Sequence, residues 1–393
     1  MEHEHRHLII GSGMTGHAAA AAIRARDPQA SIAMIGDEPH APYARPPLTK
    51  ALWNGQKTRG DVFLPPVEGL VLHAGRRAVA LDPAARVVRD DKGDTHRYER
   101  LLLATGARPR RLPSDAGRVI YLRTLSDYDR LAALPADAEV TVIGGGFIGS
   151  EIAASLSASG RRVTLVLPEE AVGARAWPAD LAAFVTSYFE QKGVHVLRGR
   201  TVAAVEADGS RARVRTSGGE VVAADAVVAG LGVEPDVELA RAAGLAQENG
   251  IVVDEAMRTS VPDVYAAGDV ARFPSAGLGG RVRVEHEDAA VSTGRVAGEN
   301  MAGGEARYET IPFFYSDLFD LGYEAVGRLD PRLTTLASWR TPFREGTVAY
   351  VGPDDTIRGL LLWGTFGQVD AARALVGRPA PGRREELAAA LGG

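Results

Sequence analysis

Residues 140–151 read Val-Thr-Val-Ile-Gly-Gly-Gly-Phe-Ile-Gly-Ser-Glu. An apolar run ends in the spacing Gly-x-Gly-x-x-Gly at Gly144, Gly146 and Gly149, and an Ala-rich helical stretch follows at once. In a strand–turn–helix unit such glycines allow a tight turn, a close backbone approach to a pyrophosphate, and close helix–sheet packing. The helix start adds free N–H groups and a positive dipole end for phosphate oxygens. The stretch predicts a Rossmann-like dinucleotide-binding domain.

The same pattern occurs at the start of the chain. Leu8–Ile10 predicts a strand, and Gly11, Gly13 and Gly16 lead into a helix that ends near Arg26. One glycine-rich turn is weak evidence, because such turns are common. Two of them on one chain, each followed by an acid at the expected distance, predict two dinucleotides, a flavin and a nicotinamide.

The acids refine the cofactor prediction. Asp37 lies about 20 residues past Gly16, where a carboxylate accepts the ribose hydroxyls. Glu169 lies 20 residues beyond Gly149 and follows the next predicted strand. A carboxylate there accepts the adenosine 2′-OH and repels a 2′-phosphate, which favours NADH over NADPH. Arg175 is near in sequence and counts against that preference.

Composition narrows the chemistry. The 393 residues suffice for two or three domains, and cysteine is absent, which excludes disulfides, thiolate nucleophiles and cysteine-ligated clusters. A net charge of −5 gives no reason to expect nucleic acid or an anionic membrane. With no membrane-spanning apolar run and no signal-like start, we expect a cytoplasmic protein.

Three further segments lead to local expectations. His3, His5 and His7 alternate in a start that we expect to be frayed and solvated; a metal site would need further ligands, and we predict none. Residues 42–53 (PYARPPLTKALW) predict an extended segment that covers the bound cofactor, followed by a short helix that begins at Lys50. The guanidinium of Arg45 could bind a phosphate through two parallel hydrogen bonds. Residues 55–100 predict short antiparallel strands without chemistry.

Several runs together resemble a known family. These are PYARPPLTKALW at 42–53, GGGFIGSEIA at 144–153, VYAAGDV at 264–270, VEHEDAAVSTGRVAGENMAG at 284–303, and LGYEAVG at 321–327. The chain resembles the FAD/NAD(P)H-dependent pyridine nucleotide oxidoreductases of the ferredoxin reductase and apoptosis-inducing factor branch, and the later runs are closest to the apoptosis-inducing factor type. No targeting or basic extension is evident, and only 341–346 stands where that type has a long insert, so no cell-death role is expected.

The resemblance implies site residues. Lys50 and Glu151 match a charge pair beside the flavin, His286 matches a histidine near the ring, and Tyr315 stands where relatives usually have tryptophan. These three, Lys50, Glu151 and His286, are the expected catalytic residues. The expected FAD-binding residues are Gly11, Gly13, Gly16, Asp37, Arg45, Lys50, Thr105, Gly106, Gly268, Asp269, Glu285, His286 and Tyr315. The expected NADH-binding residues are Gly144, Gly146, Phe147, Gly149, Glu151, Glu169 and Gly232.

The expected fold is α/β, with two glutathione-reductase-like Rossmann domains and a small α+β C-terminal domain. Residues 1–115 and 236–311 would form a discontinuous FAD domain, 116–235 the NADH domain, and 312–393 the C-terminal domain. A helix is expected from Glu285 to Met301, and two short helices at the end of the chain.

The expected function is that of an FAD-dependent NADH oxidoreductase, an enzyme that passes electrons to a ferredoxin-like iron–sulfur protein, a quinone or oxygen. The alternative is a redox sensor of the apoptosis-inducing factor type, with slow turnover and an NADH-dependent conformational change or dimerisation. We expect a monomer or homodimer, with Phe147 gating the nicotinamide pocket.

Overall fold

The computed structural model describes residues 1–381 and 386–387 of the chain. Two compact units are present. Unit 1 comprises Met1–Arg45, Gly60–Arg108 and Glu234–Pro312. Unit 2 comprises Pro46–Arg59, Pro109–Val233 and the described residues from Phe313 onward. Each unit is therefore built from segments that are far apart in the sequence.

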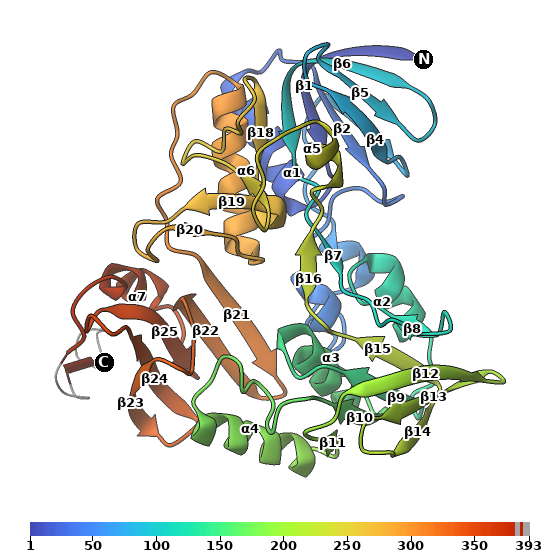
Figure 1. Ribbon diagram of the computed structural model, residues 1–393, viewed down its shortest axis with the longest axis vertical. Coiled ribbons are helices and arrows are strands. Elements are labelled where there is room, and N and C mark those ends of the chain that lie inside the picture. Colours follow the sequence, from blue (N-terminus) through green and yellow to red (C-terminus); the bar gives the residue numbers. More distant parts are fainter. Residues whose placement is uncertain (382–385, 388–393) are drawn as a thin grey trace. The chain divides into compact units, whose positions relative to one another are not determined.

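Unit 1 is organised by a seven-stranded sheet in the order β3-β2-β1-β6-β5-β4, with β18 also paired to β6. Its strands are β1 (Glu2–Ile10), β2 (Ile32–Gly36), β3 (Leu70–Ala74), β4 (Ala78–Asp82), β5 (Val87–Asp90), β6 (Thr95–Leu103) and β18 (Val264–Ala266). Helices α1 (Met14–Arg26) and α6 (Glu287–Met301) pack against each other (Figure 1). The central part of this parallel sheet, made of β2, β18 and the last three residues of β1 and β6, is continuously apolar because it is buried on both faces.

Shorter elements complete unit 1. They are α5 (Glu238–Ala242), β17 (Ile251–Val252), the 3₁₀ helix η3 (Gly268–Val270), β19 (Ala271–Pro274) and β20 (Arg281–Val282). The chain passes between the units after Arg45, at the start of the 3₁₀ helix η2 (Arg59–Val62), within β7 (Ala107–Pro109), within β16 (Val233–Pro235) and after Pro312.

The N-terminal prediction was wrong. Residues 2–10 form one strand, which pairs with β6 from Glu2↔Thr95 to Ile10↔Leu103. The long strand β6 supplies a hydrogen-bonding edge that the local sequence does not reveal, so the polar start is ordered by its partner. His7 is fully buried as a result. The expected antiparallel pairing at 55–100 holds for β4, β5 and β6, whereas β3 pairs with β2 in parallel.

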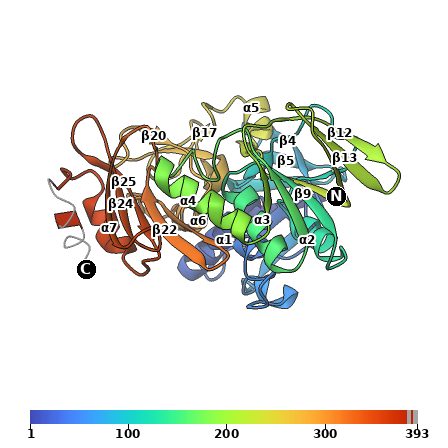
Figure 2. The ribbon, with the colours of Figure 1, turned by 90° about the horizontal axis from the view of Figure 1, so that it is seen from below.

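Unit 2 contains a second parallel sheet in the order β11-β10-β9-β15-β8. Its elements are β8 (Val119–Ile120), α2 (Leu125–Ala132), β9 (Glu139–Ile143), α3 (Phe147–Ala158), β10 (Arg162–Val166), α4 (Ala179–Gln191), β11 (His195–Leu197) and β15 (Ala226–Ala229). Strands β12 (Val202–Asp208), β13 (Arg211–Thr216) and β14 (Val221–Ala224) form an antiparallel sheet, and the β12–β13 hairpin projects outward (Figure 2).

The last part of unit 2 is an antiparallel sheet in the order β21-β22-β25-β24-β23. Its elements are β21 (Phe313–Leu318), β22 (Leu321–Gly327), β23 (Thr334–Thr341), β24 (Glu345–Val351), β25 (Ile357–Trp363) and α7 (Val369–Leu375). Trp177, from the segment after β10, packs edge-on against Tyr323 and Trp363 at ring distances of 5.7 and 5.4 Å. These rings join the second parallel sheet to the antiparallel one. The predicted fold class, two Rossmann-like sheets with a small C-terminal domain, is confirmed.

Three local predictions need correction. The segment expected to be extended contains a 3₁₀ helix η1 (Pro46–Thr49), because the fixed φ of proline suits the start of a helical turn. Lys50 lies in the turn that follows, and no helix begins there. Helix α6 begins at Glu287, with His286 as its N-cap residue. Of the two expected terminal helices, α7 is present, and the second falls largely on residues outside those described.

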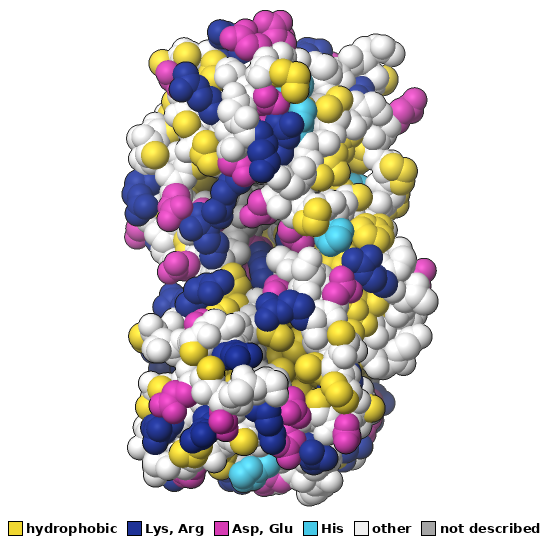
Figure 3. All heavy atoms as spheres, turned by 90° about the vertical axis from the view of Figure 1, so that its right-hand side faces the viewer, with side chains coloured by type: hydrophobic (Ala, Val, Ile, Leu, Met, Phe, Trp, Pro, Cys, Tyr) yellow, Lys and Arg dark blue, Asp and Glu magenta, His cyan; other side chains and the backbone are white. Residues whose placement is uncertain are grey.

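Two surface properties bear on partners. No helix among the described residues is long and apolar enough to cross a membrane. On the face drawn in Figure 3, basic and acidic side chains are interspersed.

Candidate functional site

The first glycine-rich turn, in unit 1, is shaped by sterics. Gly11 has φ +114°, and a Cβ there would lie 2.1 Å from the Ala104 carbonyl oxygen; one on Gly16 would lie 2.1 Å from the Gly11 oxygen. Gly13 differs, because the nearest atom to its Cβ position is Nη2 of Arg45 at 3.9 Å. Gly13 is also the N-cap of α1 and makes no side-chain cap. The turn thus exposes the free N–H groups of a helix start beside a guanidinium, which suits an anion.

The second turn, in unit 2, has the same construction. Gly144 has φ +105°, and its Cβ would lie 2.4 Å from the Gly230 oxygen; the Cβ of Gly149 would lie 1.9 Å from the Gly144 oxygen. Gly146 caps α3, and no atom lies within 4 Å of its Cβ position. In both turns the outer glycines permit the packing, and the middle glycine leaves open space at a helix start.

Arg45 has an acidic neighbour that the sequence did not reveal. Its Nη2 lies 2.6 Å from Oε1 of Glu38, and the Tyr43 hydroxyl donates to the other carboxylate oxygen. Asp37, the predicted ribose acceptor, is exposed at the end of β2, whereas the Glu38 side chain is only 14% exposed. Glu38 therefore holds the guanidinium, and Asp37 keeps a carboxylate open to solvent. In the sequence, the only indication of this ion pair was that two acids, Asp37 and Glu38, follow β2 directly.

Glycines of α6 explain part of the sequence pattern at 284–303. A Cβ on Gly294 would lie 2.4 Å from the Thr15 oxygen, and one on Gly298 would lie 2.3 Å from the Ala19 oxygen. Gly268, at φ +74°, has the Thr15 hydroxyl 2.3 Å from its Cβ position. These residues bring α6 and η3 against α1, immediately behind the first glycine turn, so much of this motif serves packing.

His286 precedes α6 as its N-cap residue. Burial lowers its pKa to about 4, with Asp269 opposing, so the imidazole is neutral at pH 7. Glu285 is exposed and pairs with Arg283 at 2.7 Å. The imidazole therefore adds no charge at the start of α6, where the acids Glu287 and Asp288 face the positive end of the helix dipole.

Thr105 and Gly106 join two passages of the chain in unit 1. The Thr105 hydroxyl donates to the Asp236 carbonyl at 2.7 Å, and the Asp236 N–H donates to the Gly106 carbonyl at 3.0 Å. The hydroxyl thus has a structural partner already.

A buried ion pair lies in unit 2. Nζ of Lys50 lies 2.7 Å from Oε2 of Glu151, with side-chain exposures of 11% and 4%. The Thr49 hydroxyl donates to Oε2 and the Ser316 hydroxyl to Oε1, each at 2.6 Å. Three segments, η1, α3 and β21, thus converge on one carboxylate. The sequence predicted the pair and missed both hydroxyls, although Ser316 follows Tyr315 directly.

Aromatic side chains lie beside this pair. The Lys50 ammonium is 5.2 Å from the ring centroid of Tyr315, within cation–π range. Phe147, 40% exposed at the start of α3, lies 4.9 Å from Phe314 by ring centroid. Burial raises the pKa of Asp317 on the same strand, while Lys50 opposes the shift. The predicted residues Lys50, Phe147, Glu151 and Tyr315 thus share one region of unit 2.

The predicted acid of the second nucleotide unit is paired. Arg175 donates through Nε to Oε1 of Glu169. The Arg175 side chain is 79% exposed and that of Glu169 19%. Solvent therefore reaches the arginine of this pair much more than the glutamate. Gly232, at φ +81°, has no atom within 4 Å of its Cβ position.

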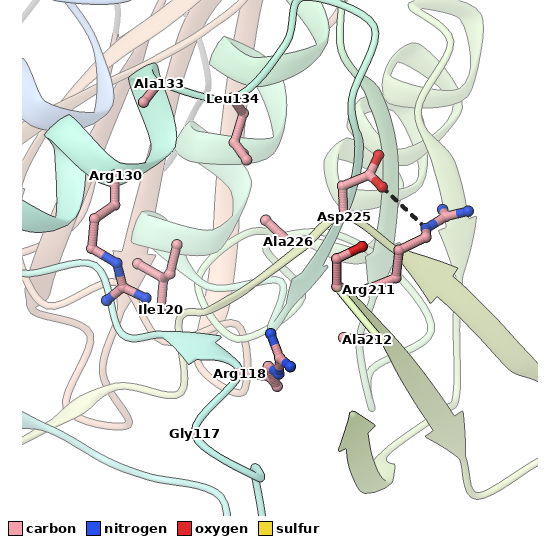
Figure 4. A pocket seen from close by; sticks show the side chains of 11 residues that line it. Gly117, Arg118, Ile120, Arg130, Ala133, Leu134, Arg211, Ala212, Asp225 and Ala226 are labelled. Atoms are coloured by element: carbon pink, nitrogen blue, oxygen red, sulfur yellow. Dashed lines mark ion pairs between the residues drawn. The ribbon is translucent and has the colours of Figure 1, made fainter. Parts of the chain in front are cut away.

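One pocket in unit 2 lies apart from these residues. It is lined by Arg118, Arg130, Arg211 and Asp225 among others, and Arg211 and Asp225 form an ion pair at 3.0 Å (Figure 4). None of the predicted nucleotide-binding residues lines it. The pocket therefore gives no indication of where the cofactors bind.

Comparison with known families decides the class. The family model for pyridine nucleotide-disulphide oxidoreductases matches residues 5–294, which include both glycine turns and the Lys50–Glu151 pair. The chain belongs to this family. A second model, for the C-terminal domain of mitochondrion-associated apoptosis-inducing factor, matches residues 297–343.

Relatives of this oxidoreductase fall on both predicted branches. It is 36% identical to the anthranilate 1,2-dioxygenase system ferredoxin–NAD(+) reductase component of Burkholderia cepacia, over 97% of this chain and 96% of that protein. It is 30% identical to apoptosis-inducing factor 1 of Dictyostelium discoideum, over 94% and 78% of the two chains. The solved complex of putidaredoxin reductase with putidaredoxin matches with a TM-score of 0.90 and 30% identity, covering 98% and 95%.

These findings confirm the predicted relationship and the enzyme class, an FAD-containing NAD(P)H oxidoreductase. The family name refers to disulphides, but this member has no cysteine. It has no thiol through which electrons could pass to a disulfide substrate.

Proposed function

We propose that this oxidoreductase carries electrons from NADH, through bound FAD, to a small iron–sulfur protein of the ferredoxin type. The observation that carries the proposal is the pair of glycine turns built alike in the two units, each with an open middle glycine at a helix start. The Burkholderia relative is named as a ferredoxin reductase component, and the similar solved structure is a complex of a reductase with putidaredoxin. The lack of cysteine supports direct transfer from the cofactor.

The first turn is the proposed FAD site. The N–H groups at the start of α1 and the Arg45 guanidinium would hold the pyrophosphate, and Asp37 the ribose. Gly268, Asp269, Glu285 and His286 are proposed to complete the site from η3 and the start of α6, and Thr105 and Gly106 from the end of β6.

The second turn is the proposed NADH site. Gly146 allows the backbone to approach the pyrophosphate, Glu169 accepts the 2′-OH, and Gly232 leaves further open space. The exposed ring of Phe147 is proposed to gate the nicotinamide.

When bound, FAD accepts a hydride from NADH and releases electrons singly, which is chemistry that the cofactor supplies. The chain's part is to align the two nucleotides and to hold fixed charge near the reacting groups. We assign that second task to the Lys50–Glu151 pair and to the start of α6 beside the neutral His286.

Steady-state turnover tests the acceptor. The proposal predicts NADH oxidation that rises at least tenfold when a ferredoxin of a monooxygenase or dioxygenase system is added, compared with a quinone or oxygen alone. Equal rates with and without any ferredoxin would overturn the proposed acceptor, while flavin reduction by NADH would still report on the cofactor assignment.

The match of residues 297–343 to the apoptosis-inducing factor model favours one second candidate, a slow NADH sensor. That function predicts negligible turnover with every acceptor, a long-lived charge-transfer absorption after NADH addition, and a change in size by light scattering. Fast turnover without such a band would exclude it.

A further inference from the structure

Four histidines from three strands meet in unit 1. The rings of His3 and His5 on β1, His73 on β3 and His96 on β6 lie within 6.1 Å of one another by centroid. For His5, His73 and His96, one ring nitrogen from each lies within 4.8 Å of the others. The sequence supplied two of these histidines as an alternating pair, and the fold adds the other two from 68 or more residues away.

We propose that His5, His73 and His96 form a binding site for a zinc-type divalent cation. Zn²⁺ binds imidazole nitrogen at about 2.0–2.1 Å in tetrahedral geometry, which places two ligand nitrogens about 3.3–3.4 Å apart. Nδ1 of His96 and Nε2 of His5 lie 3.4 Å apart, which already matches that span. The greatest separation in the cluster, 4.8 Å, needs a shift of about 1.4 Å, within the reach of a side-chain rotation.

His73 has a ring nitrogen with no competing role. Nε2 of His73 is buried and makes no hydrogen bond to any described residue. A buried polar atom without a partner is costly, and a metal ion would satisfy it.

The surroundings resemble the outer shell of a histidine metal site. Nε2 of His96 lies 3.3 Å from Oδ2 of Asp90, so this carboxylate orients the ring and leaves Nδ1 facing the cluster. The Arg76 guanidinium holds Asp90 at 2.7 Å and Asp94 at 2.5 Å. His96 and Asp90 are fully buried, so this arrangement is fixed by packing.

The protonation state also fits. Burial and the neighbouring histidines lower the pKa of His5 to about 4, and burial lowers the pKa values of His73 and His96. An imidazole binds a cation through the lone pair of its neutral form, and the direction of all three shifts favours that form. Three imidazoles without a thiolate suit Zn²⁺, Ni²⁺ or Cu²⁺ better than Mg²⁺ or Ca²⁺. Water would take the fourth position.

Binding would tie three strands together. β1, β3 and β6 each supply one ligand, so the cation would stabilise unit 1 and fix the start of the chain. This effect is independent of nucleotide chemistry, and can be measured without turnover.

Isothermal titration of the FAD-loaded protein with ZnCl₂ tests the proposal, after treatment with a chelator and without a polyhistidine tag. We expect one equivalent bound with a Kd of about 10 µM or tighter, a midpoint of thermal unfolding raised by about 5 °C at saturation, and no such rise with MgCl₂. His73→Ala should weaken binding at least tenfold. His195→Ala, at an exposed histidine on β11 in unit 2, is the matched control and should bind as the parent does.

Circular dichroism and the unfolding midpoint without metal will show whether His73→Ala folds; should it not, His5→Gln provides the same comparison. No binding to the parent protein, equal stabilisation by Mg²⁺, or unchanged affinity in the folded His73→Ala or His5→Gln variant would overturn the site.

Discussion

The ammonium of Lys50 and the carboxylate of Glu151 lie 2.7 Å apart with almost no access to solvent. Lys50 follows η1, Glu151 lies in the first half of α3, and the hydroxyls of Thr49 and Ser316 occupy further positions on the carboxylate. Both charges are thus compensated, and neither has water to replace a lost partner.

Breaking the pair should be costly. Glu151→Gln leaves the Lys50 ammonium buried and unpaired, and the free energy of unfolding should fall by about 3 kcal/mol, the lower end of the range for buried pairs because Lys50 keeps slight exposure. Arg59→Gln is the control. It breaks an exposed pair with Asp129 in the same unit and should cost less than about 1 kcal/mol. Equal losses in urea denaturation would contradict the account.

The same pair is expected to affect flavin reduction. Lys50→Ala should slow the anaerobic bleaching of the flavin by NADH about tenfold or more in stopped flow, because the proposed function assigns its fixed positive charge to the reacting groups. An unchanged rate in a folded variant would remove Lys50 from the mechanism.

Alanine substitutions at the middle and last glycines of the second turn should have different effects, one on NADH binding and the other on stability. Gly146→Ala meets no atom within 4 Å at φ −79°, so stability should hold while the Kd for NADH rises at least tenfold. Gly149→Ala places its Cβ 1.9 Å from the Gly144 oxygen and should lower the unfolding midpoint by several degrees. Unaltered NADH binding in Gly146→Ala would show that the pyrophosphate lies elsewhere.

Cofactor preference should depend on Glu169. Glu169→Ala removes the carboxylate and frees Arg175 to meet a 2′-phosphate, so the ratio of kcat/KM for NADH over NADPH should fall at least tenfold. Arg175→Ala should leave that ratio as high as in the parent. A parent enzyme that prefers NADPH would refute the assignment.

Stability should fall in mild acid. His7 is fully buried with a pKa lowered to about 4 by burial and by nearby arginines. Below its ordinary value of 6.5 the unfolded chain binds a proton that the folded chain refuses, so stability is lost between pH 6.5 and 4. At pH values below about 4 the stability lost through His7 reaches about 3 kcal/mol in the free energy of unfolding. His7→Leu should reduce the pH dependence of the unfolding midpoint in that range, and His5, His73, His96 and His286, whose pKa values are also lowered by burial, should account for the part that remains. An unchanged pH dependence in the folded His7→Leu variant would contradict this assignment.

The sequence predicted what depends on local spacing. The glycine turns at Gly11 and Gly144 were recognisable because a fixed spacing enforces a fixed backbone path. The pairing of Lys50 with Glu151 came from resemblance alone, since 101 residues separate them. The strand at Glu2 and the cluster around His73 were missed, because a distant strand supplies their partners. Sequence periodicity cannot reveal such contacts.

The central claim is that one chain binds FAD and is reduced by NADH. Its most direct test is an anaerobic titration of the purified protein, followed by absorbance near 450 nm. The account predicts a yellow protein whose flavin band bleaches fully with about one equivalent of NADH per flavin. A protein that remains colourless after incubation with excess FAD, or a yellow one whose band is unchanged by NADH, would contradict it.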